Sequence, residues 1–241
     1  MSGSNKWVFF VLFCLLSAPI FAQISSAHII YERKTNLYKK YKNENVENWI
    51  TEADKNKVDT FELFCNDTLS YFGPKESDLK EKMSWATSKN KVYINRGTGE
   101  VYAIKSVWGE DSHVRDTVLQ RAWKIVPGKR KICGYECQKA LWRPGDTLNI
   151  YAWFATELTP SAGPETFWGL PGTILGLATE DGGVVYFARQ VLLERIDLAS
   201  LQPKKYKGKV YQRSELKAKL EKDFGKEIWG KLLIQELFGI W

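Results

Sequence analysis

Apolar and polar residues alternate along most of the chain, in short runs separated by turn residues. The clearest run is 147–156, where apolar side chains fall on every second position. A period of two places alternate side chains on one face of a strand, so this run is predicted to be a strand. The other predicted strands are residues 28–33, 58–64, 68–72, 91–95, 100–108, 119–126, 129–142, 173–179 and 184–194.

Short connections rich in Gly, Pro, Asn and Asp separate these runs. The connections at 96–99, 143–146 and 180–183 are of this kind, and 109–112 is predicted to be another turn. Strands that recur about every 8–12 residues with turns between them favour an antiparallel meander. The sequence therefore predicts an α+β, mainly β fold, in which a curved antiparallel sheet forms a meander or half-barrel and a helix follows at the C-terminus.

After Pro203 the apolar residues recur at every fourth position instead of every second. Ser214 is a plausible N-cap, and the apolar positions that follow lie on one helical face. Gly225 and Gly230 each cost about 1 kcal/mol relative to alanine, so a kink or break is expected there. The repeat consists of Leu216, Leu220, Phe224, Ile228 and Leu232.

The last ten residues, 232–241, are mostly apolar. Two interpretations remain open: this end packs back on the sheet, or it docks a partner protein. The side chains that would form such a docking tail are Leu232, Leu233, Leu237, Phe238 and Trp241.

The stretch 163–177 combines glycines and prolines with large apolar residues. Glycine allows a positive φ and close backbone approach, while proline fixes φ. Such residues usually form polar surface loops, but their apolar neighbours here predict a tight turn inside the core that leads into a buried strand. The residues of this turn are Gly163, Pro164, Gly169, Leu170, Pro171 and Gly172.

The first 22 residues resemble a secretory signal peptide. Lys6 precedes an apolar run over 7–16, and small residues lead to a cleavage point after Ala22. The run is shorter than the roughly 20 residues that span a bilayer, which favours export with cleavage over a membrane anchor. We expect a signal peptide at 1–22, a β domain at 23–202 and a helical extension at 203–241.

Cleavage would leave three cysteines, Cys65, Cys133 and Cys137. If 133–137 is extended, the last two lie about 13 Å apart at about 3.3 Å per residue. This exceeds the roughly 7 Å limit for a disulfide, so a bridge would join Cys65 to Cys133 or Cys137. Three free thiols are the alternative.

Composition and motifs provide little evidence of catalysis. The net charge is +7, but the lysines are scattered among acidic residues, which does not favour nucleic-acid binding. The group at 109–113, with His113, offers metal-ligand types only within one loop, and the spacing of His113 and Cys137 does not favour a dyad. We therefore expect no cofactor, no metal and no enzymatic activity.

Five segments follow one another along the chain: 122–125 (AWKI), 132–140 (ICGYECQKA), 152–154 (AWF), 163–164 (GP) and 169–175 (GLPGTIL). In this order they resemble the GLPGLI family of exported proteins from Bacteroidota. The resemblance extends over residues 31–191; Thr173 replaces the usual leucine, Cys137 matches the family cysteine, and Cys133 is additional.

The resemblance implies a β-rich periplasmic or envelope protein without an established activity. A peripheral position at the outer membrane is an open alternative to a free periplasmic protein. The leading hypothesis is an accessory or binding protein that associates with an outer-membrane protein or envelope complex. The alternative is a carrier that holds a lipid or hydrophobic peptide in a half-barrel cavity. Three Asp-Thr-aliphatic tripeptides, at 67–69, 116–118 and 146–148, resemble periplasmic O-glycosylation sites, although such tripeptides are also common in strands.

Overall fold

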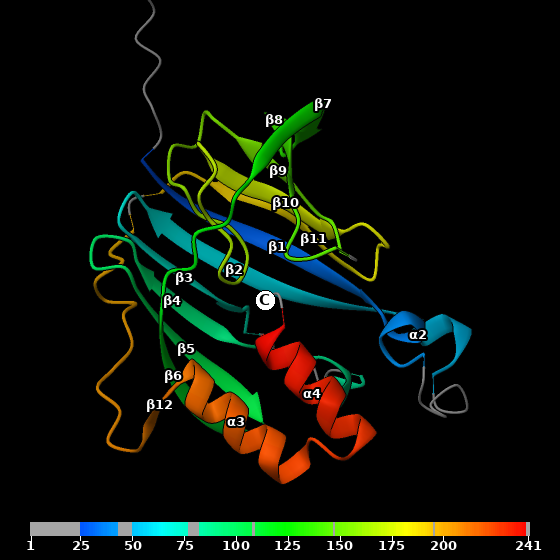
Figure 1. Cartoon of the computed structure of the whole chain (residues 1–241). Helices are drawn as coiled ribbons and strands as arrows, with labels where there is room; N and C mark the ends of the chain where they lie inside the picture. Colours follow the sequence, from blue (N-terminus) through cyan, green and yellow to red (C-terminus); the bar gives the residue numbers. More distant parts are fainter. Residues whose placement is uncertain are drawn as a thin grey trace, which may run out of the picture.

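The computed structural model describes residues 25–42, 50–76, 82–107, 109–146, 148–194 and 196–239. The predicted signal peptide and Trp241 lie outside these ranges. The described chain forms one 12-stranded sheet with helices packed on one face (Figure 1). The strands are β1 (Ser26–Asn36), β2 (Asn56–Asn66), β3 (Leu69–Pro74), β4 (Lys91–Asn95), β5 (Glu100–Val107), β6 (Glu110–Thr117), β7 (Lys124–Ile132), β8 (Tyr135–Trp142), β9 (Ile150–Ala155), β10 (Thr173–Thr179), β11 (Val184–Leu192) and β12 (Val210–Gln212).

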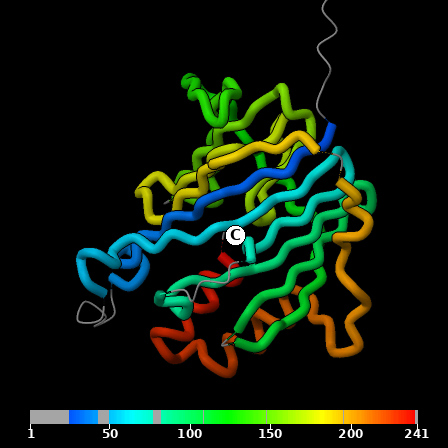
Figure 2. The backbone as a smooth tube through the Cα atoms, turned by 180° about the vertical axis from the view of Figure 1, so that it is seen from behind, coloured from blue at the N-terminus to red at the C-terminus, as the bar shows by residue number. Residues whose placement is uncertain are grey.

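The sheet consists of two antiparallel meanders joined side by side. Its order is β12-β6-β5-β4-β3-β2-β1-β11-β10-β9-β8-β7, so the seam between the meanders is the β1–β11 pair. Figure 2 shows β1 (blue) between β2 (cyan) and β11 (yellow). The short β12 pairs with β6 in parallel. The predicted mainly β fold with a curved antiparallel sheet and C-terminal helices is confirmed; the sheet does not close into a barrel.

Three of the predictions were wrong in detail. The strand predicted at 119–126 starts only at Lys124 and continues through 127–128 to Ile132, as β7. Residues 129–142 are not one strand, because Cys133 (φ 50°) and Gly134 (φ 90°) form a two-residue hairpin turn between β7 and β8. Positive φ at both positions is the requirement of the turn type that matches strand twist. The turn predicted at 109–112 is shorter than expected: Gly109 (φ 85°) is a turn residue, but β6 already starts at Glu110 and pairs with β5 along its whole length.

The inner face of the sheet, defined by the buried side chains of β1, β2 and β5, is apolar at one end and charged at the other. Along β1 the buried positions change from Ile29 and Tyr31 to Arg33. Along β2 they change from Phe61 to Asp59. Because every second side chain of a strand faces inward, the ionisable side chains at the end of β1 and β2 lie in the interior, after a series of apolar ones.

The described helices are α2 (Leu37–Lys40), η2 (Glu52–Asp54), η3 (Ser84–Ala86), α3 (Arg213–Phe224) and α4 (Ile228–Phe238). Two of them, α3 and α4, cover the inner face beside β5 and β6, whereas α2 lies at the end of β1. The expected break occurs at Gly225, which follows α3, whereas Gly230 is buried inside α4. Leu216, Leu220, Ile234, Leu237 and Phe238 pack with Val107 and Val114. Within the described ranges, the helices are too short or too polar to cross a bilayer.

The central loop, residues 156–172 between β9 and β10, folds onto the inner face. Its side chains Leu158, Phe167 and Leu170 belong to the main core, and it leads into the buried β10. Gly172 has φ 146°, and a Cβ there would lie 2.2 Å from the Ala155 carbonyl oxygen. The loop and α4 together leave space between themselves and the sheet, and that space contains the buried charges.

Candidate ligand-binding cavities

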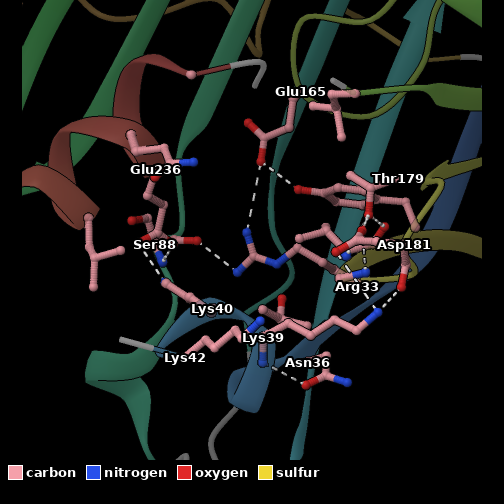
Figure 3. A pocket seen from close by; sticks show the side chains of 18 of the residues that line it. Arg33, Asn36, Lys39, Lys40, Lys42, Ser88, Glu165, Thr179, Asp181 and Glu236 are labelled. Atoms are coloured by element: carbon pink, nitrogen blue, oxygen red, sulfur yellow. Dashed lines mark hydrogen bonds and ion pairs between the residues drawn. The ribbon is translucent and has the colours of Figure 1, made fainter. Parts of the chain in front are cut away.

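Arg33 occupies the centre of the charged end of the inner face (Figure 3). Nη2 of Arg33 donates to Asp59 Oδ2 at 2.8 Å and to the Ser88 carbonyl at 2.8 Å. Nη1 of Arg33 lies 4.0 Å from Glu165 Oε1. Burial lowers the pKa of Arg33, but Tyr186, Asp59 and Glu165 outweigh it and raise this pKa above its ordinary value. Arg33 therefore stays charged, yet among the described residues its Nε has no hydrogen-bond partner.

Glu165 is the acidic counterpart of Arg33 and belongs to the central loop. Its side chain is 2% exposed, and the Tyr186 hydroxyl donates to Oε1 at 2.8 Å. Its φ is 53°, a conformation that a residue with a Cβ adopts at a cost of about 1–3 kcal/mol. The surrounding fold thus holds a strained residue with a buried carboxylate beside two cavities.

The first cavity has a volume of about 410 Å³ and lies between β1, β11, α2 and α4. Lys40 Nζ pairs with Glu236 Oε2 at 2.7 Å, and Lys39 pairs with Asp181 at 3.9 Å. Asn90 is buried, and within the described ranges its Oδ1 has no hydrogen-bond partner. The polar and charged side chains that line this cavity include Arg33, Thr35, Asn36, Lys39, Lys40, Lys42, Ser88, Asn90, Glu165, Thr179, Asp181, Gln235 and Glu236.

The second cavity has a volume of about 500 Å³ and shares Glu165 and Gly239 with the first. Its walls come from β4, β5, β6 and the segment that follows β6. Both volumes fall within the roughly 300–1,000 Å³ of small-molecule sites. The lining side chains are apolar (Val92, Val101, Ala103, Val114, Val118, Leu119, Trp142 and Pro144) and charged (Lys105, Asp116, Glu165, Arg121 and Arg213).

Arg121 is a buried cation in the second cavity. Its Nη1 donates to the Thr166 carbonyl at 2.7 Å, and its Nη2 donates to the Thr166 hydroxyl at 2.9 Å. The guanidinium lies 4.1 Å from the centre of the Phe167 ring. Among the described residues no carboxylate forms an ion pair with Arg121, and its Nε has no partner. Burial, with a smaller effect of Arg213, lowers the pKa of Arg121 to about 10.

Lys105 points into the same cavity from β5. It follows Val101 and Ala103 on the inner face, is buried, and donates from Nζ to the Leu237 carbonyl at 2.6 Å. Burial lowers the pKa of Lys105 to about 8. A cation is therefore held between the sheet and the end of α4.

The predicted turn residues lie in the central loop, with Gly163, Pro164, Leu170 and Gly172 buried and Gly169 and Pro171 exposed. They position Glu165 and do not themselves form a polar site. Gly163 also fits closely, because a Cβ there would lie 2.9 Å from Ile174 Cβ.

The three cysteines are free thiols in the structure. Cys65 and Cys137 are buried in the main core, and Cys133 is exposed in the hairpin turn. Burial raises the pKa of Cys65 to about 12 and that of Cys137 to about 11. Neither buried thiol is activated as a nucleophile.

The described part of the predicted docking tail lies against the chain itself. Leu237 and Phe238 are buried on the side of α4 that faces Val107 and Val114, Leu233 is partly buried, and Leu232 lines the first cavity. His113 stacks on Tyr206 at 3.5 Å and is hydrogen-bonded to the Tyr102 hydroxyl, at a distance from Cys137 in the sheet order. No group of three or more metal-ligand side chains occurs within the described ranges.

Sequence reasoning did not select the buried charges. In three alternating strands a charged residue occupies a position on the apolar face: Arg33, Asp59 and Lys105. The alternation could therefore have predicted that these side chains are buried. Glu165 could have been noticed as the acid within an apolar Gly- and Pro-rich stretch. For Arg121 no local pattern predicts burial, because its environment comes from Thr166 and Phe167 of the distant central loop.

Comparisons with known proteins give a partial family match and a distant fold likeness. No curated protein matches the chain. The PNGF-II structures in space groups P21 and C2 are similar with TM-scores of 0.52 and 0.53 and identities of 17% and 18%, over 78% and 81% of this chain. The chain spans only 31% and 32% of those chains, so the likeness concerns the fold alone.

MucB, in a crystal structure of its complex with MucA(peri), has a TM-score of 0.30 and 12% identity over 76% of this chain and 55% of its own. Residues 142–176, from the end of β8 through β9 and the whole central loop into β10, match the model of a family described as "Protein of unknown function (Porph_ging)".

Proposed function

We propose that this is an exported binding protein of the cell envelope, without catalytic activity, that holds a ligand on the inner face of its sheet. One observation carries the proposal: two cavities meet at Glu165, and their walls contain buried polar atoms, Arg33 Nε, Asn90 Oδ1 and Arg121 Nε, that have no hydrogen-bond partner in the part of the chain that the structure describes. Unsatisfied buried polar groups are costly in a native structure, and a bound ligand would satisfy them.

The assignment to the GLPGLI family and to the periplasm is part of this proposal. The family-like motif at 169–175 falls within the segment 142–176 that matches a family of unknown function. The resemblance supports export, and the half-barrel geometry supports the carrier alternative, in which the ligand is a lipid or hydrophobic peptide.

The test is native mass spectrometry of the protein purified from envelopes in mild detergent. We expect a stoichiometric small ligand that is lost in Ala103→Phe, because Ala103 lines the second cavity. Ser106→Phe, on the other face of the same strand, is the matched control and should keep the ligand. A ligand-free wild-type protein, or equal occupancy in both variants with unchanged melting temperatures, would contradict the proposal.

A second candidate is an accessory role at an outer-membrane protein or envelope complex. It is favoured by Ile228 and Trp229 at the start of α4, whose exposures are 55% and 46%. Co-purification from envelopes should then be lost in Trp229→Ser. Trp85→Ser, at a similarly exposed tryptophan on η3, is the control. Recovery of the same partner with both variants would exclude the α4 surface.

A further inference from the structure

We propose that the ligand carries an anionic head group, a carboxylate or a phosphate, on an apolar chain, and that the head group binds Arg121 in the second cavity. This inference rests on the proposed function, because it names the ligand class of the same site. The shared chemistry of fatty acids and lipid phosphates fits it.

The first step concerns the charge of Arg121. A buried ion is strongly disfavoured unless it is paired, and the groups that touch Arg121 are neutral: the Thr166 carbonyl, the Thr166 hydroxyl and two aromatic rings. Its Nε–H, which is buried and faces no acceptor, completes the fork that recognises carboxylates and phosphates. Arg121 therefore lacks the counter-ion that a ligand would bring.

The second step concerns the neighbouring charges. Lys105 donates to a backbone carbonyl, and Arg213 donates to the Phe238 carbonyl at 2.8 Å while its Nε lies 3.8 Å from Asp116. The other acid of the cavity, Glu165, accepts from Tyr186 and faces Arg33. Three cations against these two acids leave the second cavity with an excess of positive charge.

The third step concerns the rest of the wall, which would receive the apolar part of the ligand. Val92, Val101, Ala103 and Val114 form a continuous inner-face surface across three neighbouring strands, and Trp142 adds an aromatic ring. Burial of hydrocarbon on such a surface is favourable, and the gain grows with each CH₂ group removed from water. An amphiphile thus matches the cavity better than a small free anion.

The first cavity is a weaker candidate for the head group. Arg33 is already paired with Asp59 and faces Glu165, and Lys40 is paired with Glu236. Arg33 and Lys40 are therefore neutralised by carboxylates of the protein itself, in contrast to Arg121.

The test is calorimetric titration of the whole protein with four probes: dodecanoate, dodecyl phosphate, dodecanol and inorganic phosphate. The two anionic amphiphiles should bind at least about ten-fold more tightly than the neutral alcohol and the chain-free anion. A preference between dodecanoate and dodecyl phosphate distinguishes a carboxylate source from a phosphate source.

Arg121→Gln should reduce the affinity for the anionic amphiphiles about ten-fold or more and leave dodecanol binding unchanged. Arg121→Lys keeps the charge and should retain the preference for anions, which guards against a folding defect in the first variant. Arg130→Gln, an exposed arginine that stacks on Trp153 on the outer face, is the control and should behave as wild type.

Equal affinities for dodecanol and dodecanoate, or an Arg121→Gln variant that binds both like wild type, would overturn the inference while leaving the proposed function standing. Absence of binding by both anionic amphiphiles would also overturn it. Failure of the proposed function is recognised separately, by a wild-type protein that carries no ligand from envelopes.

Discussion

Gly172 shows how one residue fixes the geometry of the inner face. It lies where the central loop enters β10. The carbonyl of Ala155, at the end of β9, occupies the position that a side chain would need. The loop can approach β9 this closely only without a Cβ. As a consequence, Glu165, a few residues earlier in the loop, lies beside both cavities, and Phe167 packs into the main core.

Replacement of this glycine should be strongly destabilising. Gly172→Ala is expected to lower the free energy of unfolding by about 3 kcal/mol or more, because positive φ and a backbone clash act together. Gly182→Ala also has positive φ but meets no atom within 4 Å, and it should cost only about 1 kcal/mol. Chemical denaturation of both variants measures the difference; equal, small effects would show that the turn tolerates a side chain.

Lys105 should make stability depend on pH in a defined direction. Burial lowers its pKa from 10.5 to about 8 in the folded chain. Between these two values the unfolded chain binds a proton that the folded chain does not, so the contribution of Lys105 to the free energy of unfolding increases as pH rises. Wild type should therefore gain stability relative to Lys105→Met between about pH 8 and 10.5; parallel curves would contradict the burial of a titrating amine.

At the residue scale the sequence predicts which positions are buried but not how buried charges are paired. The alternation of apolar and polar residues in their strands places Arg33 and Lys105 on the inner face. Their partners, however, are Ser88, Asp59 and the end of α4, which only the assembled sheet brings near. Long-range pairing of this kind has no local signature.

Among the elements, α4 is held to the sheet by a polar anchor as well as by its apolar face. Glu236 pairs with Lys40 and accepts a hydrogen bond from the Ser88 backbone N–H at 2.7 Å. Burial lowers the pKa of Lys40, and Glu236 opposes this effect. The anchor therefore connects α4 to α2 and to the segment before β4, along one side of the first cavity.

Loss of the anchor should loosen α4 selectively. Glu236→Gln is expected to cost about 1–3 kcal/mol, because a partly buried charged hydrogen bond is lost. Amide hydrogen exchange should accelerate in α4 more than in β1 or β2. Glu221→Gln breaks an exposed pair with Lys217 on α3 and should change stability by less than about 0.5 kcal/mol. Uniform acceleration across the sheet would argue against a local role.

Element prediction succeeded where periodicity was strong and failed where a turn or an edge was unusual. The β10–β11 hairpin and the break after α3 follow from clear glycine signals. The turn at Cys133 and Gly134 lacks the usual Asn-Gly pair, and β6 is polar because its other edge meets only the short β12. Packing partners, not local propensity, decide these cases.

For the whole molecule, the mainly β architecture with C-terminal helices was predictable from the spacing of strands and turns. The seam between β1 and β11 was not, because it joins segments more than 150 residues apart, such as Glu32 and Phe187. That seam curves the two meanders into one surface, and the central loop and α4 then cover its charged end (Figure 1). The cavities are a product of this long-range arrangement.

The central claim is that the inner face holds an anionic amphiphile with its head group at Arg121. The most direct measurement is a crystal structure of the protein with 12-bromododecanoate, in which the anomalous signal of bromine locates the chain end. We predict a carboxylate within hydrogen-bond distance of Arg121 Nε and a bromine peak inside the inner face. A bromine peak on the outer face, or a carboxylate bound away from Arg121, would contradict the account.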